Sequence, residues 1–291
     1  MKRPSNGEVR DVPRAGRDQL GEGPLWSQRA NALFWTDITG RTVSRLSLED
    51  GGVTRWVVPE MIGWIIEREH ASGFIAGFQS GFAELELEPL RIAPIVDPEA
   101  HIPENRLNDA KADSRGRIWA GTMPIKADRP TGALYRFDSD RRVTKVDSNY
   151  TIANGPALSP DERWLYHTDS ALRCVYRFRL HDDGALSERI EFIRFEQDWG
   201  VPDGMTVDAE GGLWIAHWGA GRISRFRDDG ALDRFIELPA SQITSCAFGG
   251  DALDRLFVTS AAQGVEHEEY GGALFEVHTG MHGFAPHRFG G

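Results

Sequence analysis

The chain repeats one sequence unit six times. Each unit opens with a small polar stretch and an apolar strand, and a turn then leads to a second strand that contains pairs such as Leu33-Phe34 or Ile118-Trp119. The units begin at residues 22, 62, 108, 154, 203 and 244, which are 40 to 49 residues apart. This period is typical of a propeller blade and is too long for leucine-rich or helical-pair repeats. We therefore expect an all-β chain that forms a six-bladed β-propeller.

Strand and turn signals within the units agree with this fold. Apolar and polar residues alternate in residues 43–48, 132–137, 174–180 and 222–226, as expected for the third strand of a blade. Asp-Gly pairs at 50–51, 183–184 and 229–230 are typical of hairpin turns. No stretch has a sustained apolar period of 3.6 residues, so helices are not expected.

The domain organisation follows from the repeat. No Pro/Gly/Ser-rich linker divides the chain, so residues 1–291 are predicted to form one domain. Residues 1–15 and 278–291 have weak strand character and are expected to be loose ends. The later part of the first segment could add the strand that closes the ring.

Composition excludes several function classes. A net charge of −11 and a pI of 5.3 argue against a nucleic-acid surface. The chain has no apolar run of about 18 residues and no apolar signal core near its start, so we expect neither a membrane span nor export. Cys174 and Cys246 are predicted to be buried, reduced thiols. The expected location is the cytoplasm, as a monomer or small homo-oligomer.

The first residues of the six units carry the functional signal. In a propeller the inner strands begin near one mouth of the central channel, so these positions form a ring. The ring contains two carboxylates and two carboxamides, which would repel and desolvate one another around an empty axis. Either a cation or channel water must therefore fill the space. The six positions are Glu22, Ile62, Asn108, Asn154, Asp203 and Thr244.

These residue types restrict the choice of cation. Carboxylate and amide oxygens without Cys or clustered His suit a hard divalent ion. We expect one divalent metal ion, namely Ca²⁺, with Zn²⁺, Mg²⁺, Mn²⁺ or Fe²⁺ as alternatives.

Six motifs, in register from about residue 18 to residue 277, make the chain resemble the SMP-30/gluconolactonase/regucalcin-like family. A single motif has low specificity because Gly and Asp are common in blade turns. The motifs are Leu20-Gly-Glu-Gly-Pro-Leu-Trp26, residues 105–113, Gly121-Thr-Met123, residues 154–161, residues 202–214 and residues 244–250.

The resemblance implies a propeller with an axial divalent metal held by Glu22, Asn154 and Asp203. It also implies that Arg106 and Asn108 bind substrate beside the metal. The activity that it implies is that of a carboxylic ester hydrolase, a lactonase that opens a sugar lactone to the aldonic acid in carbohydrate catabolism.

The chemistry assigns individual roles. Asp203 is the candidate general base, because it would share a proton with an activated water; the alternative is that it only ligates the metal. Arg106 and Asn108 are two residues apart and would point to one side of a strand. The alternative for Arg106 is an ion pair with Asp109 or Glu104. Asp109 could orient Arg106 or cap the turn.

The chain departs from the family near the substrate. Animal members have an acidic residue two positions after the Gly-Thr-Met segment, whereas this chain has Ile125, followed by Lys126 and Arg129. Ile62 adds apolar bulk at the second blade. Ile62 and Ile125 are therefore candidate substrate contacts, and a less hydroxylated or anionic lactone becomes plausible.

Two other functions stay open. One is another metal-dependent hydrolase that acts on an aromatic or anionic lactone, an ester or an organophosphate. The other is a non-enzymatic, calcium-binding propeller. His167 and His217 are expected to be hydrogen-bonded packing residues of their blades rather than catalytic groups.

Overall fold

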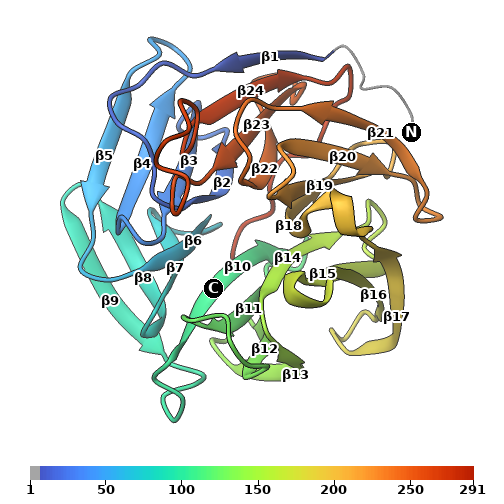
Figure 1. Cartoon of the computed structure of the whole chain (residues 1–291). Helices are drawn as coiled ribbons and strands as arrows, with labels where there is room; N and C mark the ends of the chain where they lie inside the picture. Colours follow the sequence, from blue (N-terminus) through green and yellow to red (C-terminus); the bar gives the residue numbers. More distant parts are fainter. Residues whose placement is uncertain (1–6) are drawn as a thin grey trace.

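The computed structural model describes residues 7–291 and contains, within that range, six antiparallel four-stranded sheets arranged around a central channel (Figure 1). Each sheet is one blade, and its first strand in the sequence unit is the innermost. The inner strands β2, β6, β10, β14, β18 and β22 contact their neighbours around the ring. The predicted six-bladed propeller is confirmed.

The strand bounds follow the repeat. Blade 1 contains β2 (Gly21–Ser27), β3 (Ala32–Asp37), β4 (Thr42–Ser47) and β5 (Val53–Val57). Blade 2 contains β6 (Ile62–Glu67), β7 (Phe74–Phe78), β8 (Gly81–Leu87) and β9 (Leu90–Val96). Blade 3 contains β10 (Asn105–Ala112), β11 (Ile118–Pro124), β12 (Gly132–Phe137) and β13 (Val143–Tyr150).

The second half of the ring has the same organisation. Blade 4 contains β14 (Ala153–Leu158), β15 (Trp164–Asp169), β16 (Cys174–Leu180) and β17 (Leu186–Arg194). Blade 5 contains β18 (Val201–Val207), β19 (Leu213–Trp218), β20 (Arg222–Phe226) and β21 (Leu232–Glu237). Blade 6 contains β22 (Ile243–Gly249), β23 (Arg255–Ser260), β24 (Leu274–His278) and β1 (Glu8–Asp11).

Helical structure in the described range is limited to two short 3₁₀ turns, η1 (Ser170–Leu172) and η2 (Gln197–Trp199). Residues 7–291 therefore contain no helix that is long and apolar enough to cross a membrane. The expectation of a chain without α-helices therefore agrees with the structure.

The ring is closed by the start of the chain. Strand β1 pairs antiparallel with β24 and supplies the outer strand of blade 6. Val12 continues this contact by donating its N–H to the carbonyl of Leu274 at 2.8 Å. The suggestion that the later part of residues 1–15 closes the ring is confirmed for residues 8–12, whereas residues 1–6 lie outside the described range.

The C-terminal segment is packed, so the expectation of a loose end at 278–291 is wrong. Phe289 is fully buried and stacks on Phe137 with ring centroids 5.0 Å apart. The backbones of Phe289 and Glu67 are joined by an N–H···O bond of 2.8 Å, and Arg288 pairs with the Glu67 carboxylate at 3.2 Å. Figure 1 shows the chain end lying near the centre of the ring, beside β10.

Each inner strand loses regular pairing where its repeat unit begins. The ladder shifts between Glu22 and Leu25 in blade 1, and comparable shifts occur at the start of the inner strand in the other five blades. Gly23 and Gly155 have φ values of 54° and 62° in two of these irregular stretches, a conformation that other residues rarely adopt. Bulges of this kind redirect side chains. They release the repeat-start residues from the alternation of the strand.

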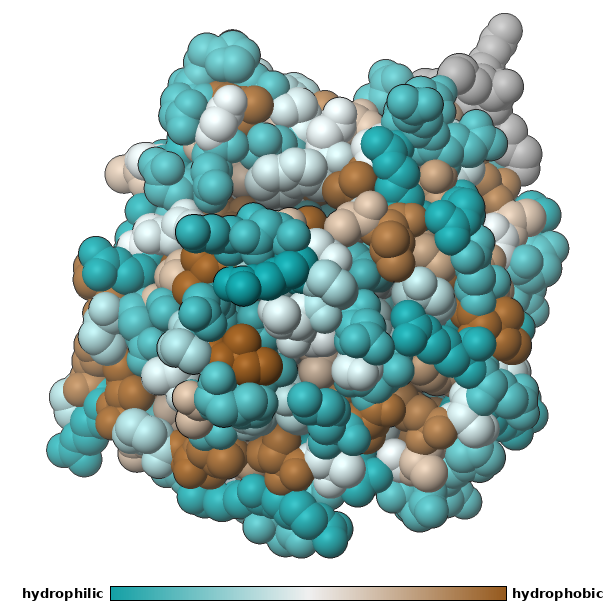
Figure 2. All heavy atoms as spheres, turned by 60° about the horizontal axis from the view of Figure 1, so that its bottom comes forward, coloured by the Kyte–Doolittle hydropathy of each residue, from teal (hydrophilic) through white to brown (hydrophobic). Residues whose placement is uncertain are grey.

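The blade cores bury most large apolar side chains. Trp35, Trp119 and Trp214 are fully buried on the second strands of blades 1, 3 and 5. Cys174 and Cys246 are free and buried, as predicted. On the face shown in Figure 2, hydrophobic residues form small patches among hydrophilic ones.

Candidate metal and substrate site

Three predicted metal ligands come from three blades and meet at one mouth of the channel. Glu22 lies on β2, Asn154 on β14 and Asp203 on β18, and their side chains are almost completely buried. The charges of Glu22 and Asp203 act on each other, which places the two carboxylates close together. No three His, Cys, Asp or Glu side chains of residues 7–291 form a metal-type cluster, so the candidate donor set is two carboxylates and one amide.

The oxygen atoms of this site fit a cation. Asp203 Oδ1 is buried without a hydrogen-bond partner among the described residues. A buried polar atom without a partner is costly, and a bound cation would supply the missing interaction. Glu22 has one backbone partner, the N–H of Gly23, which donates to Oε2 at 3.0 Å. Acidic and amide oxygens match the preference of hard divalent ions.

Burial controls the charge of the site. Desolvation raises the pKa of Glu22 to about 8, and the nearby Asp109 carboxylate adds to the effect. Desolvation also raises the pKa of Asp203, with further contributions from Glu22 and Asp109. The pKa of Arg106 is lowered to about 10, because burial of its guanidinium outweighs the attraction of Glu22 and Asp203. The carboxylates therefore need a positive charge nearby in order to stay ionised.

A chain of hydrogen bonds joins the predicted substrate residues to the metal ligands. Arg106 Nη1 donates to Asn108 Oδ1 at 2.6 Å, which confirms that both side chains lie on one side of β10. Asn108 Nδ2 donates to Asn154 Oδ1 at 2.7 Å. The Arg106 Nη1 partners are Asn108 Oδ1 and the carbonyl of Leu107, and within residues 7–291 no ion pair joins Arg106 to Asp109 or Glu104. The alternative role for Arg106 is therefore wrong.

Asp109 contacts the backbone of neighbouring residues rather than Arg106. Its Oδ1 accepts the N–H of Ala110 at 2.7 Å, and it also interacts with the backbone of Gly155. Burial raises the pKa of Asp109, and the charge of Lys111 partly opposes the shift. Asp109 therefore links the candidate metal site to Lys111 further along the channel, and no contact with Arg106 supports the suggestion that it orients that side chain.

The two apolar candidates lie in different surroundings. Ile62 is fully buried and packs in the core shared by blades 1 and 2, with Val58 and Phe78. Ile125 follows β11, is 39% exposed and donates its N–H to the carbonyl of Glu104 at 2.8 Å. Ile62 therefore belongs to the blade core, whereas Ile125 stays available at the rim.

Two basic residues that could bind an anionic substrate group, Lys126 and Arg129, are exposed. Lys126 and Arg129 lie on the loop after β11, and Arg129 pairs with Asp128 at 3.6 Å. A cavity of about 210 Å³ instead lies between blades 2 and 3 beside Arg106. Its polar lining includes Gln79 and Ser80.

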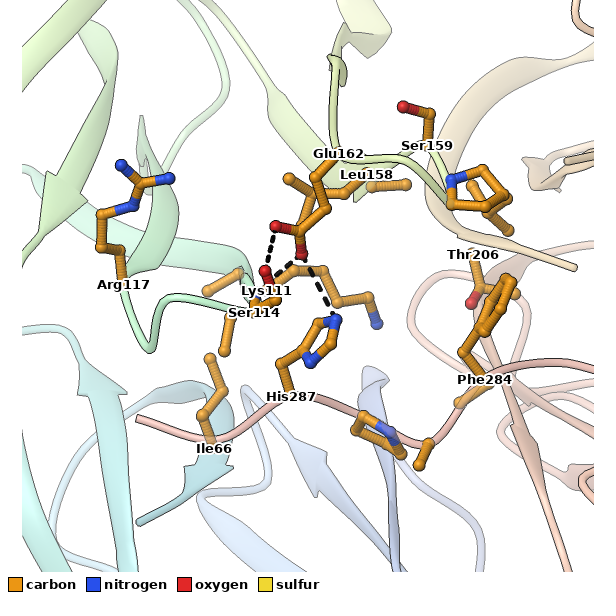
Figure 3. Close-up of a pocket in the computed structure, with 18 of the residues that line it drawn as sticks. Ile66, Lys111, Ser114, Arg117, Leu158, Ser159, Glu162, Thr206, Phe284 and His287 are labelled. Atoms are coloured by element: carbon orange, nitrogen blue, oxygen red, sulfur yellow. Dashed lines mark hydrogen bonds and ion pairs between the residues drawn. The ribbon is translucent and has the colours of Figure 1, made fainter. Parts of the chain in front are cut away.

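A larger cavity of about 790 Å³ lies at the other mouth of the channel. Its walls come from the ends of the inner strands, where Lys111 and Thr206 lie, and from the C-terminal segment. In Figure 3 the side chains of Lys111 and His287 point into this space, and Glu162 contacts His287 at 3.3 Å. The C-terminal segment thus covers this mouth.

Ser170 belongs to the site but was not predicted. It follows the Thr-Asp pair that ends the second strand of blade 4, at the position that Ile38 occupies in blade 1. Its hydroxyl accepts from Asn154 Nδ2 at 2.9 Å and donates to the carbonyl of Pro202 at 2.6 Å. The sequence does contain a signal that could have identified Ser170: it is polar at a repeat position that is apolar in blade 1.

The two histidines pack as expected but differ in hydrogen bonding. His217 Nδ1 contacts the carbonyl oxygen of Trp199 at 2.7 Å. His167 lies edge-on to Tyr150 with ring centroids 4.6 Å apart, and neither of its ring nitrogens has a partner among the described residues. The predicted hydrogen-bonded role is therefore wrong for His167.

The protein is thus a six-bladed propeller with a polar site on its axis. The site contains the carboxylates of Glu22 and Asp203 and the amides of Asn108 and Asn154. The chain belongs to the SMP-30/gluconolactonase/LRE-like family, whose model matches residues 20–262.

Individual relatives match most of the chain. The 6-deoxy-6-sulfogluconolactonase of Pseudomonas putida is 34% identical over 94% of this chain and 95% of its own length. A pentonolactonase of Haloferax volcanii is 36% identical over 84% of this chain and 82% of its own. The solved structure of a luciferin-regenerating enzyme has a TM-score of 0.93 and 32% identity, and covers 98% of this chain and 100% of that one.

Proposed function

We propose that this protein is a divalent-metal-dependent lactonase that opens a sugar lactone to its aldonic acid. Family membership and relatives named as lactonases support the reaction class. The observation that carries the metal dependence is the convergence of Glu22, Asn154 and Asp203 around the unpartnered Asp203 Oδ1.

Glu22, Asn154 and Asp203 would hold the ion. When bound, a divalent cation supplies a Lewis acid that polarises the lactone carbonyl and stabilises the developing negative charge. Asp203 accepts a proton from the attacking water through a carboxylate oxygen that the ion leaves free, and returns it to the ring oxygen as the acyl C–O bond breaks. The products are then a carboxylate and a free hydroxyl on one open chain, with one proton released.

Arg106 orients the substrate in this proposal. Asn108 Oδ1 and the carbonyl of Leu107 fix its guanidinium by accepting from Nη1, which leaves the Nε and Nη2 groups to bind lactone hydroxyls. The adjoining cavity between blades 2 and 3 offers Gln79 and Ser80 as further polar groups. These polar groups can hydrogen-bond the hydroxyls of a sugar lactone, which is why we place the sugar lactone first.

A substrate panel with and without chelator tests the function. Acid release would be followed with glucono-1,5-lactone, a pentonolactone, a 6-sulfonated gluconolactone and dihydrocoumarin. We expect turnover of the hydroxylated lactones, loss of activity in EDTA and recovery on addition of Ca²⁺, Zn²⁺, Mg²⁺ or Mn²⁺. Turnover of dihydrocoumarin alone would favour another hydrolase, whereas saturable Ca²⁺ binding without any turnover would favour the non-enzymatic propeller.

The variant Asp203→Asn separates the two roles of Asp203. If Asp203 is the base, kcat should stay at least about 100-fold below that of the unaltered protein even at saturating metal. If it is only a ligand, metal affinity falls but saturating metal restores kcat. Exposed Asp182→Asn serves as the control for loss of one carboxylate. A variant with unchanged affinity and unchanged kcat would remove Asp203 from the site.

A further inference from the structure

Asn154 can ligate a cation only if its amide is turned the right way. The side chain carries an oxygen that accepts and a nitrogen that donates, and a rotation by half a turn exchanges them. With the nitrogen toward the axis, the amide would present N–H groups to a cation and repel it. Whatever fixes this orientation therefore controls the metal site.

The Asn154 amide belongs to a chain of hydrogen bonds, and the groups at the two ends of this chain can each act in only one way. They set the orientation of the amide. Arg106 has only donors, so Asn108 must turn its oxygen toward Arg106 and its nitrogen toward Asn154. The carbonyl of Pro202 has only acceptor capacity, so the single proton of Ser170 is committed to it. Ser170 Oγ can then only accept from Asn154, which requires Asn154 Nδ2 on that side.

Ser170 is held rigidly in this position. Ser170 is 2% exposed, and it begins the turn η1, in which the Asp169 side chain accepts the N–H of Ala171 at 3.2 Å. Asp169 also accepts the backbone N–H of Thr151 at 3.1 Å, just before β14 begins. The hydroxyl therefore has little freedom to seek other partners.

The same hydroxyl reaches the strand of the second carboxylate ligand. Pro202 immediately precedes Asp203, and the ladder between β18 and β19 is interrupted from Pro202 to Met205. The backbone around Asp203 therefore lacks regular pairing with β19. The bond from Ser170 to the Pro202 carbonyl supports it from blade 4.

We propose that Ser170 is a positioning residue that orients the Asn154 amide and fixes its distance from Asp203, so that both present oxygen to one divalent cation. This inference rests on the proposed metal site. It assigns Ser170 no contact with substrate, and it predicts that loss of the hydroxyl weakens metal binding while the blade stays folded.

The test measures Mn²⁺ and Ca²⁺ binding to the full chain by calorimetry. Removal of a group that orients a metal ligand typically costs 10- to 100-fold in metal affinity, so we expect at least about a tenfold loss for Ser170→Ala. Ser170→Thr keeps the hydroxyl and should recover most of the affinity. Ser159→Ala is the matched control, because Ser159 is also a buried, hydrogen-bonded serine of blade 4.

The outcomes are distinct. Ser159→Ala should bind both ions within about twofold of the unaltered protein, and thermal unfolding in EDTA shows whether each variant is folded. Equal affinity of Ser170→Ala and the unaltered protein would overturn the role of Ser170 and leave the metal site standing. If the unaltered protein binds neither ion, both the metal site and the role of Ser170 fall.

Discussion

At the scale of single residues, two buried histidines make stability depend on pH. Burial lowers the pKa of His167 to about 3, with a smaller contribution from Arg189. Burial likewise lowers the pKa of His217 to about 3, with a contribution from Arg222. Both rings are therefore neutral in the folded protein, whereas the ordinary value in an unfolded chain is near 6.5.

The sign of the pH effect follows from proton binding. Below about pH 6.5 the unfolded chain takes up protons that the folded chain does not, so the stabilisation is complete above that pH and is lost progressively towards pH 3. Each histidine contributes a slope of up to about 1.4 kcal/mol per pH unit in this window. Urea unfolding at several pH values between 7.5 and 4 should show a smaller slope for His167→Gln than for the unaltered protein. An unchanged slope in His167→Gln would contradict the assignment.

Residue types at repeat positions predicted the polar mouth of the channel but not its details. Glu22, Asn154 and Asp203 lie together because their positions in the repeat are equivalent, and a repeat is visible in one sequence. Ile62 shares that repeat position but packs in the blade core. The strand is irregular at this point, so the position in the repeat does not fix the direction of the side chain. Ser170 comes from a turn outside the strand pattern, so its contact with Asn154 depends on geometry that spacing does not contain.

At the scale of elements, the hairpin between the first and second strands carries a recurring buried unit. In blade 5, Asp208 accepts from Trp214 Nε1 at 2.7 Å and from Arg225 Nε at 2.6 Å. In blade 3, Asp113 accepts from Trp119 Nε1 at 2.9 Å and from Arg117 Nε. The six-residue spacing from Asp to Trp is present in both segments of the sequence. The unit ties the tip of the hairpin to the blade core.

Breaking this unit should be costly. Asp208 is fully buried and Arg225 nearly so, hence Asp208→Ala leaves a buried guanidinium without its main partner. Loss of one member of a buried ion pair typically costs about 3–5 kcal/mol. Asp182→Ala removes a pair with Arg115 of 2.8 Å, close to the 2.6 Å of the Asp208 pair, but the Asp182 side chain is 98% exposed, so less than about 1 kcal/mol should be lost. Chemical denaturation of both variants makes the comparison, and similar losses would show that the buried unit is not a special contributor.

At the scale of the whole molecule, the repeat predicted the number of blades and the location of the site at one mouth. It could not predict how the other mouth is covered. Residues 279–291 lie beyond the last blade strand and lack strand alternation, yet they cross the far mouth and join blades 2 and 3. Their packing depends on shape complementarity with a surface that exists only after the ring has closed, and no local pattern records it.

Two phenylalanines of this segment test whether it holds blades 2 and 3 together in solution. Phe289 is fully buried against Phe137, so Phe289→Ala removes a complete aromatic ring from a packed core and should lower the free energy of unfolding by about 3–5 kcal/mol. Phe284 lies five residues earlier and is 46% exposed, so Phe284→Ala should change stability by only about 0.5 kcal/mol. Hydrogen exchange of β6 and β10 should also accelerate in Phe289→Ala alone, because these strands flank the buried ring. If the two variants unfold alike, the C-terminal segment does not hold blades 2 and 3 together.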